Sequence, residues 1–396
     1  MDRVYGFEDV GLKMINFLLI SLVFPDEFSL DLFGLRLSAY RIMLLFGFFK
    51  AYATYNNLIK RHVCDYIILF ISIWTVISLA VNHGAVIGIK SGGIIALETF
   101  SPYIMARVYV NNIRSLISLG KSYVFLVCLL PLFSIPENIY GVNYIKDLFI
   151  GGSIHPNEIR LGLHRAEGGF NHPILLGVFA AGCISLSIII YKAFSFRTFI
   201  VVIASFSSLS SVAFIMVFIQ LIIMHIPIFK IKKSIFIFLG CIYVFVDIIL
   251  GKNILNFLLS HFTLNPQTAY FRKIIYEFAY NNVIDNPIFG LGFNDWVRPY
   301  WLPYSVDSFW MVEALKYGFP VLFSLIYISY IVLFKTYKYD GCIYSKGIVY
   351  TFTAIVFAGI TVHFWGSVYV LFFFIVGCSF FNYGGRDENS VILKKK

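Results

Sequence analysis

Long apolar runs separated by shorter polar stretches dominate the pattern of this chain. A helix that crosses a bilayer needs roughly 17 to 25 mostly apolar residues, and about twelve runs approach or reach that length. They lie near residues 11–24, 34–52, 63–81, 85–106, 119–136, 172–191, 197–209, 211–229, 234–251, 307–334, 346–363 and 366–382. The pattern predicts an all-α polytopic membrane protein with one integral membrane domain over residues 1–396.

The composition agrees with this class. Of the 396 residues, 59% are hydrophobic and 13% are charged, with a mean hydropathy of +0.81. Soluble domains have fewer apolar and more charged residues than this. The first apolar run is short, follows a start of mixed charge and has no small-residue cleavage site, which predicts an uncleaved span. The six cysteines are scattered without a CxxC pair, so they predict neither a disulfide framework nor a metal site.

Basic residues sort to alternate loops between the runs and so predict an orientation. These residues are Lys60, Arg61, Arg107, Arg114, Lys121, Lys192, Arg197, Lys230, Lys232, Lys233, Lys335, Lys338, Lys346 and Lys394 to Lys396. Loops rich in Lys and Arg stay on the cytoplasmic side, so these loops and both termini are expected in the cytoplasm. The net charge of +10 is then mainly an orientation signal, and nucleic acid is not an expected partner.

Two loops on the opposite side, residues 137–171 and 252–306, are too long to be simple connectors. We therefore expect function on that outer side. In the second loop, one helical face carries Tyr270, Phe271, Ile274, Ile275 and Phe278, and the other carries Arg272, Lys273, Tyr276, Glu277 and Tyr280. This pattern predicts a helix lying at the membrane surface, with Thr268 as its N-cap. Gly290 and Gly292 predict tight turns after it.

Three arginines in these loops are candidate anion contacts. Arg165 lies shortly before Pro173, which opens the next span; a guanidinium beside a helix N-terminus attracts phosphate or pyrophosphate. An interfacial arginine that extends to the membrane surface is the alternative. Arg272, close to the predicted start of the surface helix, indicates a bound anion. Arg298, next to Trp296, is expected either to stack on aromatic rings or to bind sugar or phosphate, and the aromatic residues around it fit a carbohydrate face or an interfacial belt.

Asp307 is the candidate general base. A carboxylate at the start of an apolar span is costly to desolvate unless it has a partner or a task; acting as the N-cap of that span is the alternative interpretation. Glu167 and Asp295 are the substitute bases. His155, His164 and His172 are close together but match no standard zinc spacing, so no metal is expected.

Three segments carry a resemblance to a known family. They are RAEGGFNHPILLG at 165–177, FRKIIYEFAYNNVIDNPIFGLGFNDW at 271–296 and DSFWMVEALKYGFP at 307–320. In this order they resemble the O-antigen polymerase and O-antigen ligase superfamily of bacterial inner-membrane proteins, which process polysaccharide carried on undecaprenyl pyrophosphate. The middle segment, an Arg-led helix followed by D-N-P-x-F-G-x-G, is the most specific of the three.

The resemblance implies a metal-independent membrane glycosyltransferase without cofactors, in the bacterial cytoplasmic membrane with its active site facing the periplasm. It implies that Arg165 and Arg272 contact the lipid-linked pyrophosphate while Asp307 acts as the base. The expected substrate-binding residues around them are Arg298, His172, Glu167, Asp295, Ser308 and Trp296.

Two departures from the family pattern bear on the activity. Ligases of the superfamily typically carry His, then Asn, Ser or Gln, then nine residues and Gly; here Ser308 and Gly318 keep that spacing, but Asp307 replaces the His. This favours a polymerase. Where the family often has a Ser-x-Ser-Arg segment, this chain has Val212 in place of the Arg, so Arg298 or Arg160 is the candidate replacement.

The expected reaction transfers undecaprenyl-pyrophosphate-linked glycan onto the next lipid-linked repeat unit of an O-antigen, capsule or exopolysaccharide. Expected partners are this lipid-linked oligosaccharide, a repeat-unit flippase, a chain-length regulator and membrane lipid. A ligase acting on lipid A core or protein is the first alternative. A polysaccharide or lipid transporter is the second, although transporters tend to carry interrupted helices in inverted repeats, whereas the polar residues here gather on one side.

Overall fold

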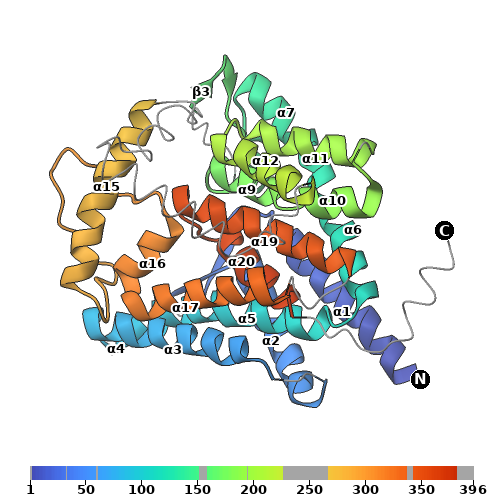
Figure 1. The fold of residues 1–396 in the computed structure, drawn as a ribbon, viewed down its shortest axis with the longest axis horizontal. Helices are drawn as coiled ribbons and strands as arrows, with labels where there is room; N and C mark the ends of the chain where they lie inside the picture. The colour runs from blue at the N-terminus through green and yellow to red at the C-terminus, as the bar shows by residue number, and fades with distance from the viewer. Residues whose placement is uncertain are drawn as a thin grey trace.

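The computed structural model describes residues 2–32, 34–58, 61–150, 158–193, 195–225, 266–336 and 342–380, and helices dominate them (Figure 1). The helices are α1 (Asp2–Ser21), α2 (Ala39–Leu58), α3 (Val63–His83), α4 (Ala85–Ile87), α5 (Gly93–Tyr109), α6 (Ile113–Leu129), α7 (Pro131–Tyr140), α8 (Tyr144–Ile150), α9 (Pro173–Ala181), α10 (Ile184–Tyr191), α11 (Phe196–Ser207), α12 (Ser211–His225), α15 (Pro266–Asp285), α16 (Phe309–Tyr317), α17 (Phe319–Tyr330), α19 (Ile343–Thr361) and α20 (Ser367–Cys378).

Short π-helices and two small hairpins complete the described elements. The π-helices are η1 (Gly88–Gly92) and η3 (Ile331–Thr336). Strands β1 (Ser29–Leu32) and β2 (Leu35–Ser38) pair in antiparallel fashion, as do β3 (Ile159–Arg160) and β4 (Leu163–His164).

Four helical segments are long and apolar enough to cross a membrane. They are Val63–His83, Ile113–Tyr140, Pro173–Tyr191 and Ile343–Thr361. Shorter apolar helices are Val10–Ser21, Phe196–Ser207, Ser211–His225, Phe319–Phe334 and Ser367–Cys378. The helices thus have the character of a membrane protein, and the all-α class is confirmed.

The predicted number of about twelve spans is not confirmed. The predicted span 34–52 includes strand β2 before α2 begins. The predicted span 307–334 is divided at Gly318, which separates α16 from α17. The predicted span 234–251 lies outside the described residues.

Helices α19 and α20 lie between two groups of helices (Figure 1). On one side α20 packs against α5, which also contacts α2 and α3; on the other side α19 packs against α10 and α12. Buried apolar side chains from these helices form one hydrophobic core, and a few buried polar pairs, such as Thr99 with Tyr369 and Ser185 with Thr351, bond across the contacts.

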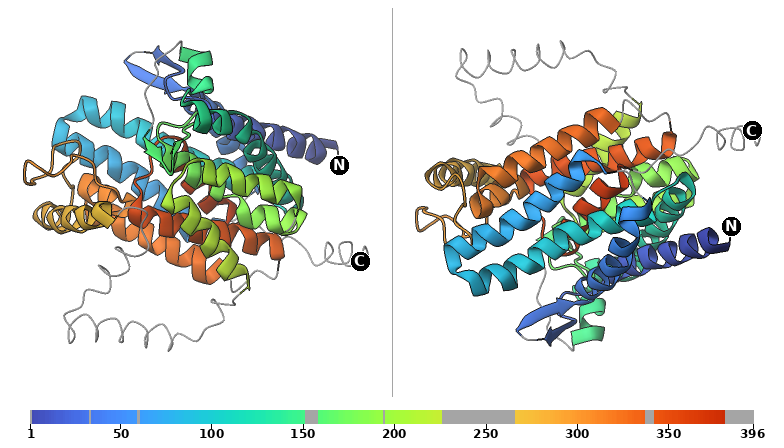
Figure 2. Two further views of the ribbon diagram at one scale, coloured as in Figure 1. Left: turned by 90° about the horizontal axis from the view of Figure 1, so that it is seen from above. Right: turned by 90° about the horizontal axis from the view of Figure 1, so that it is seen from below.

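Helix α3 shows which segments lie at opposite ends of the bundle. At its start, Asp65 lies 3.3 Å from Arg107, and the ring of His62 stacks on Phe380. At its other end, His83 Nε2 accepts a hydrogen bond of 2.7 Å from the backbone N–H of Phe293. A helix of 21 residues is about 30 Å long, so the loop after α15 lies about one bilayer core away from Arg107. Both views in Figure 2 place α15 away from the start of α1.

Helix α15 rests on a second, smaller hydrophobic cluster. The cluster comprises Ile275, Ala279, Val283, Trp296, Leu302, Val306, Val312, Ala314 and Leu315. The predicted apolar face of α15 is therefore only partly correct. Phe271 is 43% exposed, whereas Arg272 and Tyr276 lie on the same side as Ile275, because the cluster takes a stripe of residues spaced by four.

The predicted N-cap of this helix is wrong. The described helix already includes Pro266, so Thr268 lies within its first turn and Arg272 within its second turn. Arg272 therefore lies farther from the helix N-terminus than the sequence pattern suggested.

Two glycines allow the loop after α15 to pack closely against the junction between α16 and α17. Gly290 and Gly318 have φ values of +61° and +79°, in a region that favours glycine. The backbone N–H of Leu291 donates to the Leu315 carbonyl at 2.6 Å, and that of Phe319 donates to the Pro287 carbonyl at 2.8 Å. The predicted tight turn at Gly290 is confirmed, and the structure adds its packing partner.

Candidate functional site

A cleft of about 450 Å³ opens beside α16 and contains part of the predicted site. Its walls are the loop after α15, the segment that leads into α16, the turn before α9 and the turn between α19 and α20. The lining residues with polar or aromatic side chains are His172, Phe293, Asn294, Trp296, Tyr304, Ser305, Asp307, Lys316, Thr361, His363 and Trp365. The structure thus brings His172 together with Trp296 and Asp307, which lie more than a hundred residues later in the sequence.

Arg272 and Asp307 form an ion pair at this cleft. Arg272 Nε lies 3.5 Å from Asp307 Oδ2, and the side chains are 15% and 45% exposed. Although the charges are within ion-pair distance, Arg272 Nε is buried and makes no hydrogen bond to any described residue. Of this pair, Asp307 lines the cleft, whereas Arg272 lies behind it and is not among the lining residues.

Ser308, and not Asp307, is the N-cap of α16. Ser308 Oγ accepts a hydrogen bond of 3.4 Å from the Met311 N–H and donates one of 3.2 Å to the Gly359 carbonyl. The interpretation of Asp307 as a cap is therefore wrong. The neighbouring serine does the capping and leaves the Asp307 carboxylate at the cleft.

Tyr276 supports this arrangement from α15. Its hydroxyl lies 3.2 Å from the Asp307 carbonyl and 2.5 Å from the Ile360 carbonyl, which compete for its single proton. Burial raises the pKa of Tyr276 to about 12, so the hydroxyl stays a donor at neutral pH. Sequence analysis missed this residue, although its position one turn after Arg272 places both on one helical face.

His172 lies at the start of α9 and caps that helix. Its Nδ1 accepts a hydrogen bond of 3.1 Å from the Ile174 N–H, and its ring meets Trp365 edge to face. Burial, reinforced by the positive charge of Arg165, lowers the pKa of His172 to about 4. The imidazole is therefore neutral at physiological pH, with Nδ1 as an acceptor.

Arg165 does not line the cleft. The residue is 2% exposed. Its Nη1 donates a hydrogen bond to Glu158 Oε2 at 2.8 Å, and its Nε donates one to the Ser208 carbonyl at 3.3 Å. Its Nη2 has no hydrogen-bond partner among the described residues. Arg160 shares Glu158 at 3.4 Å. The predicted site is thus divided into the cleft around Asp307 and a second cationic centre formed by Arg160 and Arg165.

Glu158 holds this second centre in the described structure. Partial burial would raise the pKa of Glu158, but the hydrogen bond from Arg165 and the charges of both arginines hold it below its usual value. Arg160 also approaches the Leu209 carbonyl at 3.4 Å, three residues before Val212. This position fits the predicted role of Arg160 as the replacement for the missing arginine, which stays a prediction.

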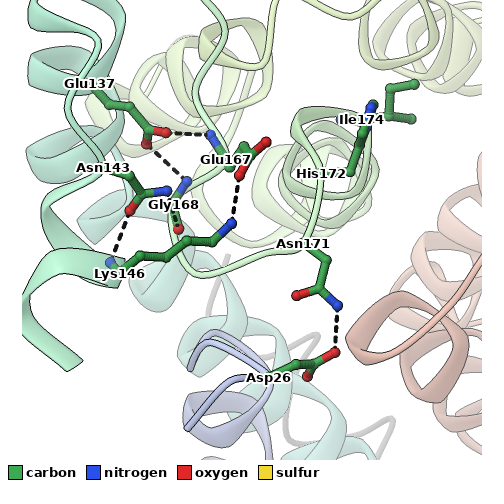
Figure 3. A network of polar contacts seen from close by, with 9 residues as sticks. All are labelled: Asp26, Glu137, Asn143, Lys146, Glu167, Gly168, Asn171, His172 and Ile174. Atoms are coloured by element: carbon green, nitrogen blue, oxygen red, sulfur yellow. Dashed lines mark hydrogen bonds and ion pairs between the residues drawn. The ribbon is translucent and has the colours of Figure 1, made fainter. Parts of the chain in front are cut away.

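Glu167 belongs to a network that fixes the loop before His172 (Figure 3). Its carboxylate pairs with Lys146 at 2.6 Å, and the backbone N–H groups of Glu167 and Gly168 donate to Glu137 at 3.0 and 2.9 Å. Asn171 donates to Asp26 Oδ2 at 2.6 Å. Glu167 therefore positions the loop and is not among the residues that line the cleft.

Arg298 also has an internal role in the described structure. It forms an ion pair with Asp295 and lies over the rings of Trp296 and Tyr304, at 5.2 and 5.3 Å from their centres. Its Nε donates to the Leu302 carbonyl at 3.2 Å. The predicted stacking of Arg298 is confirmed, and the stack holds two aromatic residues that line the cleft.

Several residues that line the cleft were not predicted from the sequence, among them Lys316, His363 and Trp365. From the sequence, Trp365 and its neighbours are expected to form only a tight turn between two spans. Their position opposite His172 depends on the packing of α9 against α20, which no local pattern reveals.

Within the described part of the chain, no group of three or more His, Cys, Asp or Glu side chains is placed to hold a metal ion. Comparisons of the chain with protein-family models, with curated proteins and with solved structures found no match.

Proposed function

We propose that this protein is a membrane glycosyltransferase that joins lipid-linked oligosaccharide repeat units, acting as a polysaccharide polymerase. The observation that carries the proposal is the ion pair between Arg272 and Asp307 at the cleft, where a carboxylate and an incompletely bonded guanidinium lie 3.5 Å apart. Aromatic side chains such as Trp296 and Trp365 line the same cleft, and their faces suit sugar rings.

In the proposed mechanism, Asp307 removes the proton from a hydroxyl of the acceptor sugar. The hydroxyl oxygen then attacks the anomeric carbon of the donor glycan, and the bond between that carbon and the pyrophosphate oxygen breaks. Undecaprenyl pyrophosphate leaves with the electron pair. Arg272 stabilises the charge that grows on the leaving group, the kind of electrostatic contribution that is usually large in such transfers. Cationic side chains supply this charge, so the step requires no metal.

Arg165 is the candidate for a second pyrophosphate contact. Its buried Nη2 lacks a partner among the described residues, and Arg160 adds charge beside it. A polymerase holds a donor and an acceptor that both carry pyrophosphate, which is consistent with two cationic centres. The ring of His172 meets Trp365, and the charge of Arg165 lowers its pKa. His172 is proposed to separate the two cationic centres.

The proposed location is the bacterial cytoplasmic membrane, with both termini in the cytoplasm and the cleft on the outer side. The position of the loop after α15, at the end of α3 away from Arg107, supports this topology. Within the proposal, the partners are a repeat-unit flippase and a chain-length regulator.

The test is a gel of cell-surface glycan from a deletion strain complemented with wild type, Asp307→Asn or Arg272→Lys, at matched membrane expression. We expect both variants to leave single repeat units, because the lysine keeps the charge but loses the planar fork. The control is Asp285→Asn, an exposed carboxylate at the end of α15. Full-length chains that accumulate on undecaprenyl pyrophosphate would instead indicate a ligase, and unaltered chains would contradict both readings.

A further inference from the structure

Lys316 places an ammonium group in the cleft beside aromatic rings. It lies on the last turn of α16, is partly buried, and belongs to the cleft lining. Its Nζ lies 5.9 Å from the centre of the Phe293 ring. Phe293 also lines the cleft, so the ammonium is on the cleft side of α16.

The backbone around this ammonium is fixed from two directions. The Lys316 carbonyl accepts hydrogen bonds from the Gly292 N–H at 3.0 Å and from Ser78 Oγ at 3.2 Å. Phe293, the residue after Gly292, donates a hydrogen bond from its backbone N–H to His83 Nε2. The lysine and its aromatic neighbour are therefore attached to the end of α3, a rigid span, which favours a preformed site.

His363 is a second basic residue of the cleft that contains Lys316. This histidine comes from the turn between α19 and α20 and lines the same cleft. Burial, and after it the positive charge of Lys316, lowers the pKa of His363 to about 3.

No described residue neutralises Lys316 through an ion pair. The only carboxylate that lines the cleft, Asp307, pairs with Arg272. Glu313, one turn earlier on α16, influences Lys316 electrostatically, but among the described residues no ion pair joins them. An anionic group from outside the chain would therefore stabilise the charged form of Lys316 in this cleft.

We propose that Lys316 binds the carboxylate of an acidic sugar, so that the glycan handled by this cleft contains a uronic-acid-type residue. The inference rests on the proposed glycan-transfer function and narrows its substrate class. The aromatic residues of the lining, Trp296, Trp365 and Phe293, present faces to the sugar ring, while Lys316 supplies the charge that distinguishes an acidic ring from a neutral one.

A pyrophosphate is the second source of negative charge that the lysine could meet. Arg272 is the better placed group for it, because its guanidinium lies beside the proposed base and offers a planar fork. Lysine acts as a point charge at the end of a flexible stem, which suits a carboxylate on a ring held by aromatic contacts.

The test measures binding of trigalacturonate and of its methyl ester to the full-length protein in detergent, by quenching of tryptophan fluorescence. The ester has the same sugar backbone but no charge, and Trp296 and Trp365 in the cleft are the reporters. We expect the wild type to bind the acid at least about tenfold more tightly than the ester, as loss of a hydrogen bond to a charged group implies. Lys316→Met should reduce that ratio to near one, and Lys316→Arg should retain part of it.

The control variant is Lys90→Met, which removes an exposed lysine from another part of the protein. An unchanged acid-to-ester ratio in Lys316→Met would overturn the inference, as would a wild type that binds neither trisaccharide. Inorganic pyrophosphate serves as a third probe. If Lys316→Met loses pyrophosphate binding and the wild type shows no preference for the acid, the lysine binds phosphate and the inference is wrong.

The two proposals fail in different ways. Normal polysaccharide in cells with Asp307→Asn, together with a Lys316 effect on the acid-to-ester ratio, would leave a sugar-binding site but remove the transferase. Blocked chain growth in those cells with an unchanged ratio would keep the transferase and remove the acidic-sugar assignment.

Discussion

Replacing Gly318 by alanine tests how the cleft is built. Gly318 has φ +79° and ψ −176°, a conformation that is nearly restricted to glycine. An added Cβ would lie 2.6 Å from the Pro287 carbonyl oxygen and would also collide with the Ile288 carbonyl. Both atoms are backbone and belong to the loop that leads to the cleft, so neither can move without the loop.

The magnitude has two parts. An alanine forced into this backbone conformation costs about 1–3 kcal/mol. Forcing a methyl group against packed backbone costs about 1–3 kcal/mol more. We therefore expect Gly318→Ala to lower the free energy of unfolding by about 2–6 kcal/mol in total.

Gly84 is a matched control for the first part. It also lies between two helices, with φ 85° and ψ 160°, but an added Cβ would meet nothing within 4 Å. Gly84→Ala should therefore cost only the backbone strain, about 1–3 kcal/mol. The difference between the two variants isolates the collision with the loop.

The assay is unfolding in mixed micelles with increasing dodecyl sulfate, followed by tryptophan fluorescence. The reasoning is refuted if Gly318→Ala loses no more stability than Gly84→Ala. In the surviving folded fraction of Gly318→Ala, we also expect weaker glycan binding, because a displaced loop breaks the bond between the Gly292 N–H and the Lys316 carbonyl.

Two further predictions concern charge. Glu158→Gln removes the negative charge that Arg165 and Arg160 share, so the purified variant should bind inorganic pyrophosphate a few times more tightly than the wild type. Asp285→Asn is the control, and equal affinities of wild type and Glu158→Gln in calorimetry would contradict this prediction. The pKa of His172 is about 4 in the folded protein, against an ordinary value of 6.5. Between pH 6.5 and pH 4 the unfolded chain therefore binds more protons at this residue than the folded protein does. The free energy of unfolding should fall as the pH drops through that range. Denaturation curves across that range should be less pH-dependent in His172→Gln, and an unchanged dependence would count against this assignment.

The sequence predicted features that depend on local chemistry. The apolar runs indicated an all-α membrane protein, and the glycines after α15 indicated a tight turn at Gly290. Arg272 and Asp307 were both selected as site residues, and the structure brings them within 3.5 Å. These features follow from composition, from helical spacing or from residues that polar chemistry makes unusual in an apolar chain.

The sequence could not predict features that depend on distant partners. Glu167 was a candidate base, but it pairs with Lys146. Arg165 was expected to contact the lipid-linked pyrophosphate together with Arg272, but it bonds to Glu158 and to the Ser208 carbonyl and does not line the cleft. A charged residue in a loop shows that it needs a partner without showing which one. The predicted apolar face of α15 was only partly correct for a similar reason, because the small cluster beneath the helix determines which of its residues face inward.

The choice between Asp307 and Ser308 as the helix cap shows the limit of spacing arguments. Both residue types are strong N-caps, and they are adjacent. Only the position of the first helical residue, Phe309, decides between them, and helix boundaries shift easily by one residue. That single residue changes Asp307 from a cap into a group that faces the cleft.

The small cluster beneath α15 has a consequence for how such a protein can evolve. Because α15 and the loop after it pack on a core of their own, substitutions there leave the packing of the membrane helices intact. The two cores meet along α16, which contributes Phe309 and Tyr317 to the larger core and Val312 and Leu315 to the smaller one. If the proposed function holds, glycan recognition can diversify between lineages while one scaffold is inherited, and α16 marks where segments from two relatives would have to match in a chimera.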